Sequence, residues 1–408
     1  MKITLVSQWF PPEQAPIGYM IKELADALSD EGHDVTIITG FPNHPTGVVF
    51  SGYKKKWILK ESIYNYKVTR VWLATSSRRS PLSRVITFLT FTFTSTLALL
   101  LQPRPQLIFA VFQPISVGLT LPILARVKNA KLILNVQDLH PNVQIELGMI
   151  RNPLIIKLLK KIEYFGYKHA SALTVICDAF RDHCIEHGAK SENVEIIPNW
   201  IDVDEIQPGE RDNLFRRGLG LDGSHFIVLY AGTIGLVSGA SVMVGAAQQL
   251  TDLPHVRIVF VGEGPLVSIL KQEVELLGLS NVIFAPFQPR EMLSTVQAIA
   301  DVSVVSLKRG KGNASVPSKV LGYMAAARPV IASVDANSET AHTVLMSKCG
   351  LVTDSDNHSA LAGAIRYLSS NKELRMSLGL NGRDYLEKNY TKQIVTSKFI
   401  NFFKQVAK

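Results

Sequence analysis

The stretch Phe226-Ile227-Val228-Leu229-Tyr230-Ala231-Gly232-Thr233-Ile234-Gly235 decides the fold of the second half of this chain. Its first six residues are apolar without polar alternation, which predicts a strand buried on both faces, as in a parallel sheet covered by helices. The glycines predict a tight turn, and the segment after Gly239 predicts a helix. A strand, a glycine turn and a helix in this order indicate an α/β domain.

The same alternation of strand and helix runs along the whole chain, with one interruption. We expect strands at residues 3–7, 35–39, 68–73, 107–111, 131–136, 172–176 and 194–198, then at 226–231, 256–261, 282–285, 302–306, 330–333 and 351–353. We expect helices to start near Gly18, Pro81, Ile115, Pro153 and Asp178. The pattern stops between residues 198 and 223, which predicts two doubly wound domains, 1–200 and 201–385. Two closing helices are expected at 372–388 and 391–406, and residues 386–408 are free to pack back onto the first domain.

Composition places the chain among globular proteins. It has 408 residues, of which 47% are hydrophobic and 19% charged, so disorder and fibrous structure are excluded as its main content. Cys177, Cys184 and Cys349 form no Cys-x-x-Cys pair, which argues against a disulfide framework or structural zinc and favours a reducing compartment. We take the histidines as scattered and expect no metal-binding pair among them. The N-terminus lacks the pattern of a signal peptide, so we expect the cytoplasm.

Charge is unevenly distributed. The net charge is +9, and residues 1–200 hold 22 Lys and Arg against 15 Asp and Glu, an excess of seven. Such a half could face anionic lipid, nucleic acid or a phosphorylated substrate. Residues 85–103 carry no charge, but their hydroxyls at Thr87, Thr90, Thr92, Thr94, Ser95 and Thr96 favour a buried or interfacial helix over a membrane span.

Glycine turns at two expected strand ends predict a nucleotide site in the second domain. Gly232, Thr233 and Gly235 follow one strand, and Gly262, Glu263 and Gly264 follow the next. Such turns let backbone amides approach a diphosphate, although close packing of helix on strand also requires glycine. The motif Gly218-Leu219-Gly220-Leu221-Asp222-Gly223 precedes a strand and is therefore interpreted as a plain turn.

A lysine at an expected helix start is the preferred phosphate ligand. In Ser315-Val316-Pro317-Ser318-Lys319, Pro317 suits a first helical turn, and a cation there is unfavourable unless an anion binds as well. Lys308, Arg309 and Lys311 lie just before it. Asp202-Val203-Asp204 and Asp354-Ser355-Asp356 have a spacing that could hold a divalent metal, but the first is in the linker and the second fits a helix-capping turn, so no metal is expected.

Three segments resemble the retaining glycosyltransferases of family 4. They are residues 31–36 (Glu-Gly-His-Asp-Val-Thr), residues 197–202 (Ile-Pro-Asn-Trp-Ile-Asp) and residues 325–333 (Ala-Ala-Ala-Arg-Pro-Val-Ile-Ala-Ser). Residues 41–45 (Phe-Pro-Asn-His-Pro) and 317–319 (Pro-Ser-Lys) resemble the subgroup that builds bacterial surface polysaccharides and lipid-linked oligosaccharides. The resemblance implies a GT-B architecture of two facing Rossmann-like domains with a cleft between them and no required metal or cofactor.

The resemblance also implies roles for individual residues. The donor, a nucleotide sugar and most simply a UDP-sugar, would lie on the second domain, with Phe287 and Glu339 adding to the glycine turns and Lys319. The acceptor, lipid-linked or glycan, would lie on the first domain against Glu13, Pro16, Gly18, Asn43 and His44. The family's His-Asp pair is replaced here by Gln137-Asp138, with His140 two residues further on, and Asp138 or His140 could orient the acceptor or stabilise developing positive charge.

The sequence departs from the family at its usual carboxylates. Ala314 and Gly322 occupy the positions of two glutamates, and residues 233–241 lack the usual basic side chains. A non-catalytic GT-B binding subunit and a UDP-sugar epimerase therefore remain alternatives. The favoured expectation is a retaining glycosyltransferase that contacts anionic lipid at the inner face of the cell membrane and binds no nucleic acid.

Overall fold

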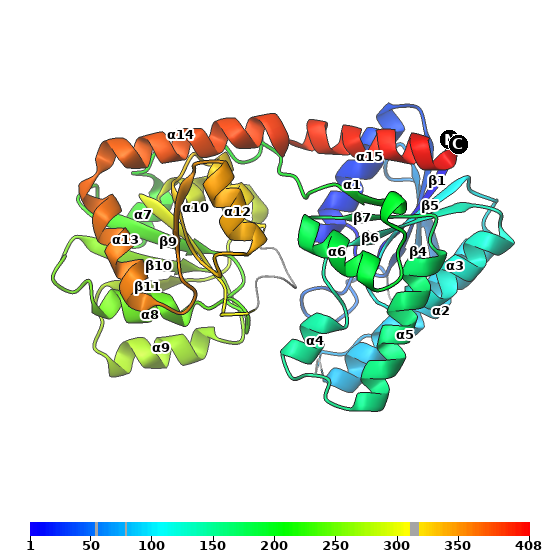
Figure 1. The fold of residues 1–408 in the computed structure, drawn as a ribbon, viewed down its shortest axis with the longest axis horizontal. Coiled ribbons are helices and arrows are strands. Elements are labelled where there is room, and N and C mark those ends of the chain that lie inside the picture. Colours follow the sequence, from blue (N-terminus) through cyan, green and yellow to red (C-terminus); the bar gives the residue numbers. More distant parts are fainter. Residues whose placement is uncertain (54–55, 78–79, 311–317) are drawn as a thin grey trace. The chain divides into compact units, whose positions relative to one another are not determined.

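The chain forms two compact units. The computed structural model describes residues 1–53, 56–77, 80–310 and 318–408. The first unit holds residues 1–198 and 395–408, and the second holds residues 199–394 (Figure 1). The closing helix α15 (Lys392–Ala407) therefore belongs almost entirely to the first unit, although the chain has passed through the second before reaching it.

The first unit is built on a sheet in the order β3-β4-β2-β1-β5-β6-β7-β8. Every pair is parallel except β3 with β4. The strands are β1 (Lys2–Val6), β2 (Asp34–Gly40), β3 (Ile58–Glu61), β4 (Lys67–Val71), β5 (Leu107–Val111), β6 (Lys131–Val136), β7 (Ala172–Val175) and β8 (Val194–Ile196). The sequence did not predict β3, because its four residues alternate between exposed and half-buried and carry no apolar run.

Helices cover both faces of this sheet, because the strand order reverses at β1 and connections between parallel strands are right-handed. They are α1 (Pro16–Asp30), α2 (Pro81–Leu101), α3 (Val117–Val127), α4 (Asn142–Glu146), α5 (Pro153–His169) and α6 (Asp178–Glu186), with a short 3₁₀ turn η1 (Ser191–Asn193). Helix α15 packs on the sheet through Phe399 and Phe403, whose rings lie 5.7 and 5.1 Å from that of Phe109 in β5. Lys404 of α15 also pairs with Glu31 at the end of α1 at 2.9 Å.

The second unit has a six-stranded parallel sheet in the order β11-β10-β9-β12-β13-β14. Its strands are β9 (Phe226–Ala231), β10 (Val256–Val261), β11 (Val282–Ala285), β12 (Val302–Ser306), β13 (Val330–Ser333) and β14 (Gly350–Thr353). Its helices are α7 (Leu214–Gly218), α8 (Ser241–Gln248), α9 (Val267–Leu276), α10 (Leu293–Ala298), α11 (Lys319–Ala325), α12 (Glu339–Met346), α13 (His358–Ser370) and α14 (Lys372–Asn389), with η2 (Arg290–Met292).

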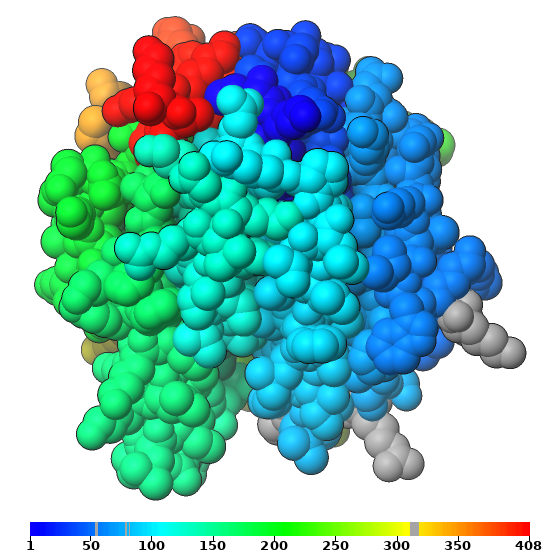
Figure 2. Space-filling view, turned by 90° about the vertical axis from the view of Figure 1, so that its right-hand side faces the viewer, coloured from blue at the N-terminus to red at the C-terminus, as the bar shows by residue number. Residues whose placement is uncertain are grey.

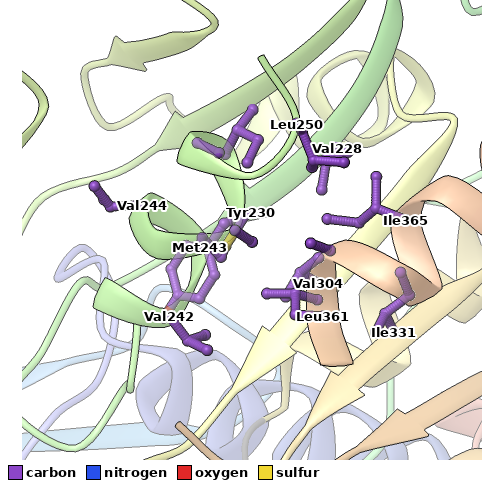
Figure 3. Close-up of a cluster of buried hydrophobic side chains, with 14 of the residues drawn as sticks. Val228, Tyr230, Val242, Met243, Val244, Leu250, Val304, Ile331, Leu361 and Ile365 are labelled. Carbon is purple, nitrogen blue, oxygen red and sulfur yellow. The ribbon is translucent and has the colours of Figure 1, made fainter. Parts of the chain in front are cut away.

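The core of the second unit follows from the alternation of side chains along β9. Val228 and Tyr230 point toward α8 and α13, where they pack with Met243, Leu361 and Ile365 (Figure 3). Their neighbours Ile227 and Leu229 enter the cluster on the opposite face, with Val296. Burial of one such side chain contributes about 1.5–3 kcal/mol. Both faces of β9 are therefore covered by apolar side chains and excluded from solvent, which explains its uninterrupted apolar sequence.

Helix α2 contains most of the charge-free segment 85–103. It turns its hydroxyl groups toward the protein and most of its large apolar side chains toward solvent. Its hydroxyls face the protein: Thr94 donates to the Trp72 carbonyl at 2.7 Å, and Thr92 and Thr96 bond to Ser116 and Thr120 at 2.7 and 2.9 Å. Phe91 and Leu99 are buried, but most of its large apolar residues are exposed, namely Leu82, Val85, Ile86, Leu89, Phe93, Leu97, Leu100 and Leu101. By length and composition alone, the helix over residues 82–101 is able to cross a membrane, and 33% of an 18-residue stretch within it is buried inside the protein.

Candidate functional site

The predicted donor residues collect at one edge of the second sheet. Strand β9 lies between β10 and β12, so successive crossovers leave it in opposite directions, and ligands of open α/β sheets bind in the crevice at such a switch point. Because all six strands are parallel, the loops at their carboxyl ends share this edge. Those loops hold Gly232, Thr233 and Gly235 after β9, Gly262, Glu263 and Gly264 after β10, Phe287 after β11, Ser318 and Lys319 after β12, and Glu339 after β13.

The loops after β9 and β10 are pressed against each other. A Cβ on Gly262 would lie 2.1 Å from the Gly232 carbonyl oxygen, and one on Gly264 would lie 2.2 Å from that of Ile234. The amide of Ile234 donates to the Glu263 carbonyl at 2.9 Å. Glycine is therefore required here by loop packing alone, and the same packing holds a bare stretch of backbone at the switch point. Gly235 differs, since a Cβ built on it would lie 3.8 Å from its nearest neighbour, the Thr233 side chain.

Lys319 is the first residue of α11, and it is half-buried, with its side chain against β9. Its Nζ donates to the Tyr230 hydroxyl and, at 3.1 Å, to the Thr233 carbonyl, and it lies 3.7 Å from the centroid of the Tyr230 ring. Burial lowers the pKa of Lys319 to about 7. The ammonium is thus placed beside the glycine turn and has only neutral partners among the described residues, an environment that a nearby anion would improve.

Two tyrosines hold Lys319 and the end of β9, and sequence reasoning missed both. Tyr323, one turn along α11, accepts from the Ala231 amide at 2.9 Å and donates to the Ala231 carbonyl at 3.3 Å. Tyr230 donates to the Thr233 carbonyl at 3.1 Å. Their sequence signal is weak, because a tyrosine in an apolar strand or helix is normally core. Here burial and a polar tip at the strand's end give each tyrosine a positioning role.

The other predicted donor residues are placed less tightly. Phe287 is 52% exposed beyond β11. Glu339 begins α12, where its carboxylate lies 3.9 Å from His342, and Ser338 caps the helix by accepting from the Ala341 amide at 3.2 Å. Ser318 is exposed. Ser315 and Pro317, with Ala314 and Lys311, lie outside the described residues.

Each Asp-x-Asp segment has an aspartate that contacts a distant part of the chain. Asp356 accepts from the Arg309 amide at 3.0 Å, so it anchors the loop after β12, while Asp202 pairs with Lys392. A different group does have ligand spacing. His183 and His187 are four residues apart, and Glu163 lies beside them. The expectation of scattered histidines was therefore wrong, because this pair is visible in the sequence itself.

In the first unit, Glu13 is the buried group of the loop after β1. Its Oε1 accepts from the amides of Asn43 and His44 at 2.7 and 2.9 Å, which ties this loop to the one after β2. Its Oε2 is buried with no hydrogen-bond partner among the described residues. Burial raises the pKa of Glu13 to about 7, against the lowering effect of these amides. Pro16 starts α1, and Gly18 packs against the backbone of Phe10, where a Cβ would be 3.2 Å away.

Asp138 and His140 lie in the loop after β6, at the same edge of the first sheet. The His140 ring is buried, and its Nδ1 contacts the Gln144 amide at 2.7 and 3.0 Å. Its Nε2 is buried without a hydrogen-bond partner in the part of the chain that the structure describes. The amide of His140 donates to the Asp138 carbonyl at 3.1 Å. One ring nitrogen is thus oriented by Gln144 of α4, and the other is left for a further contact.

Two family models match the chain, one in each half. Residues 17–200 match the family described as "Glycosyl transferase 4-like domain", and residues 212–385 match "Glycosyl transferases group 1". The chain belongs to the group 1 glycosyltransferases. The enzyme class expected from the sequence, a transferase of glycosyl groups, is confirmed.

Individual proteins support the family and the fold. The colanic acid biosynthesis glycosyl transferase named WcaI of Escherichia coli is 26% identical to the chain over 409 residues, covering 98% of the chain and 99% of WcaI. Sucrose-phosphate synthase from Thermosynechococcus elongatus superposes with a TM-score of 0.78 at 19% identity, over 99% of this chain and 98% of the synthase. HepE from Anabaena, solved in complex with UDP and glucose, has a TM-score of 0.73 at 15% identity, over 99% of both chains. These structures confirm the GT-B fold.

Proposed function

We propose that this glycosyltransferase moves a sugar from a UDP-sugar to a lipid-linked or glycan acceptor, with retention of anomeric configuration, in the assembly of a bacterial surface polysaccharide. The observation that carries the proposal is the ammonium of the half-buried Lys319 beside the two glycine turns at the switch point. UDP in the HepE structure supports the choice of nucleotide, and the name of WcaI supports the choice of pathway.

The donor would lie with its diphosphate at the edge formed by Gly232, Gly262 and Lys319. When the bond between the sugar C1 and the diphosphate oxygen breaks, its electron pair stays on the diphosphate and negative charge grows there. A cation held in a buried position stabilises that charge more than it stabilises the intact donor. Lys319 would also supply charge that the missing basic side chains of residues 233–241 cannot.

The acceptor would lie against the first unit. Its hydroxyl oxygen forms the new bond to C1, and its proton passes to the departing diphosphate, so that UDP and the glycoside are the products. Asp138 and His140 are proposed to orient this hydroxyl, since His140 has its Nδ1 held and its Nε2 unpartnered in the described structure. Glu13, Asn43 and His44 would shape the acceptor site through the hydrogen bonds that join their loops.

The donor half of the proposal is tested by offering the purified chain nucleotide sugars without an acceptor and then with lipid extracts. We expect UDP release that is slow alone and faster with the acceptor. A changed sugar on an intact diphosphate would instead show an epimerase, and binding without either reaction would show a non-catalytic subunit.

Proton uptake gives the donor test a second readout. An anion beside Lys319 raises its pKa from about 7, so UDP binding at pH 7.5 should take up protons. Calorimetry in buffers of different ionisation enthalpy measures this uptake. Equal heats in all buffers, with UDP bound, would remove Lys319 from the phosphate site.

A lipid-linked acceptor requires contact with a membrane, and the first unit has a surface suited to it. The exposed apolar face of α2 is continued by Leu119, Ile123 and Val127 on α3 and by Leu154, Ile155 and Leu158 on α5. Figure 2 shows this side of the first unit, coloured by position in the sequence. Lys157, Lys160 and Lys161 border it on α5. Apolar residues with a basic rim are typical of helices that lie in an anionic membrane interface, so the proposed location is the inner face of the cell membrane.

Vesicle binding tests this location. The chain should bind vesicles of anionic lipid, less at high salt, and Phe93→Asp should weaken that binding at least tenfold. Leu276→Asp is the matched control, because Leu276 is 87% exposed on α9 of the second unit. Equal binding of the two variants would reject the α2 face as the contact surface.

A further inference from the structure

A buried carboxylate and two histidines meet between α5 and α6 of the first unit. Glu163 lies on α5 with no exposed surface, and His183 lies on α6, where its side chain is 10% exposed. His187 follows one turn later, at the end of α6, and is half-buried. One ligand atom from each of the three lies within 4.8 Å of the other two.

The carboxylate of Glu163 is only half satisfied. Its Oε1 bonds to His183 Nε2 at 2.8 Å. Its Oε2 is buried and makes no hydrogen bond of normal geometry among the described residues, although the buried Tyr167 hydroxyl lies close to the carboxylate. Buried polar atoms are nearly always paired, and an unpaired carboxylate oxygen is among the most unfavourable to leave so. Tyr167 and Cys184, both buried, also lie near this carboxylate.

The hydrogen bond made by His187 prepares its ring as a ligand. Its Nδ1 lies 2.9 Å from the His183 carbonyl oxygen, and because that oxygen can only accept, Nδ1 carries the proton. Nε2 is then left with a lone pair. A ligand histidine whose other nitrogen donates to a backbone carbonyl is the usual arrangement in metal sites. The rings of His183 and His187 also stack, with their centroids 4.0 Å apart.

We propose that Glu163, His183 and His187 bind a divalent transition metal ion, with Zn²⁺ as the expected ion, and that the ion joins α5 to α6. Two imidazole nitrogens and one carboxylate oxygen are a ligand set that zinc accepts, with water as the fourth ligand. Zinc bonds of about 2.0–2.1 Å separate tetrahedral ligand atoms by about 3.3–3.4 Å. The three ligand atoms now lie within 4.8 Å of one another and the two rings are stacked, so the side chains would move closer and the rings would turn when the ion binds. His183 Nε2 would release its proton to bind the metal, so affinity should fall in acid.

This inference does not depend on the proposed transfer reaction, and its test uses no activity assay. Tag-free full-length protein is stripped with EDTA and titrated with ZnCl₂ against a chromophoric chelator. We expect one zinc per chain and a higher melting temperature with zinc than with EDTA. His187→Ala should lower zinc affinity more than about 100-fold, since even loss of an outer-shell contact costs 10- to 100-fold. His169→Ala, an exposed histidine at the end of α5, is the matched control and should bind like the parent.

A second probe reports the geometry. Co²⁺ in place of zinc should give the visible absorption of a four-coordinate site in the parent and in His169→Ala, but not in His187→Ala. Glu163→Gln should also lose the metal. If that variant does not fold, His187→Ala decides, because His187 is half-buried at a helix end and its loss leaves the helix intact. Zinc binding that is equal in His187→Ala and His169→Ala, or no stoichiometric zinc in the parent, would overturn the proposal.

Discussion

The two units handle a buried charge at the carboxyl edge of the sheet in opposite ways. The first unit buries an acid, Glu13, in the loop after β1, and burial raises its pKa from 4.5 to about 7. The second buries a base, Lys319, after β12, and burial lowers its pKa from 10.5 to about 7. Desolvation disfavours the charged form in both cases, so it drives acid and base toward the same neutral value. The charge of each group can therefore change near neutral pH when a charged ligand binds beside it.

The difference lies in what each group touches and in the sign of its effect on stability. Glu13 accepts two backbone amides, whereas Lys319 rests on an aromatic ring and a carbonyl. The contribution of Glu13 to folding is fully present below pH 4.5 and is lost as the pH rises to about 7. The contribution of Lys319 is fully present above pH 10.5 and is lost as the pH falls to about 7. The two groups thus make the stability of the protein depend on pH in opposite directions, Glu13 in the first unit and Lys319 in the second.

Removal of the Lys319 charge should have the largest effect. Lys319→Ala and Lys319→Met should both lower the rate of glycosyl transfer by roughly 100- to 1000-fold, or about 3–4 kcal/mol, because the cation stabilises the departing diphosphate. Lys319→Met keeps the buried stem and removes a desolvated cation, so its melting temperature should not fall. Turnover and melting temperature are measured together.

The matched control for this experiment is Lys308→Met, an exposed lysine of the loop after β12. It should transfer at nearly the parent rate. Lys319 variants with rates within a few-fold of the parent, at unchanged melting temperature, would exclude this residue and direct attention to the loop cluster.

Glu13→Gln isolates the acid of the first unit. The amide keeps an oxygen for the Asn43 and His44 amides but cannot ionise, so between pH 4.5 and 7 the parent should lose up to about 3 kcal/mol relative to the variant. Denaturant unfolding at several pH values, followed by fluorescence, measures this, since Trp9, Trp57 and Trp72 all lie in the first unit. Parallel pH profiles of parent and variant would mean that Glu13 is not desolvated.

His140→Ala should slow transfer about 100-fold, the lower range for a group that acts on a proton or its hydroxyl. UDP affinity should stay at the parent value, because His140 belongs to the first unit and the proposed donor site to the second. Calorimetry with UDP and initial rates with acceptor separate the two quantities. A weaker UDP affinity in this variant would place His140 at the donor instead.

A pair of glycine variants gives the smallest effect. Gly262→Ala places a Cβ 2.1 Å from the Gly232 carbonyl at a φ of 150°, so it should cost more than about 1 kcal/mol of stability and weaken UDP binding. Gly235→Ala meets nothing closer than 3.8 Å and should change neither by more than about 0.5 kcal/mol. Thermal unfolding with and without UDP compares them. Equal effects would mean that the two loops are not in contact.

Most of the fold was predictable because its strands are apolar on both faces. The run at 226–231 is β9 to the residue, and the expected run at 131–136 is β6. The edge strand β3 was not predictable, since an exposed edge does not need an apolar sequence. The orientation of α2 was also hidden, because threonine hydroxyls bonded to neighbouring elements let its polar side face inward.

The candidate site was predictable where a residue type conflicts with its local position. Lys319 drew attention as a cation at a helix start, and Gly232, Gly262 and Gly264 as glycines at strand ends. Tyr230 and Tyr323 gave no such signal, since each fits a buried strand or helix and only the packing shows its polar tip on the backbone or on Lys319. His183 and His187 had a signal in their spacing, but its partner Glu163 is 20 residues away in sequence and is joined only by the packing of α5 on α6.

The sequence by itself determined the two α/β units, the glycosyltransferase family and the edge of each sheet at which loops collect. The two units and the loop edges follow from periodicity and turn residues, which are local properties of the chain, and the family follows from the resemblance of residues 31–36, 197–202 and 325–333. Only the tertiary structure decided that Lys319 rests on Tyr230, that Glu13 is buried and that α2 exposes its apolar side. Burial and desolvation depend on which elements pack together, and a side chain's charge state and partners depend on burial.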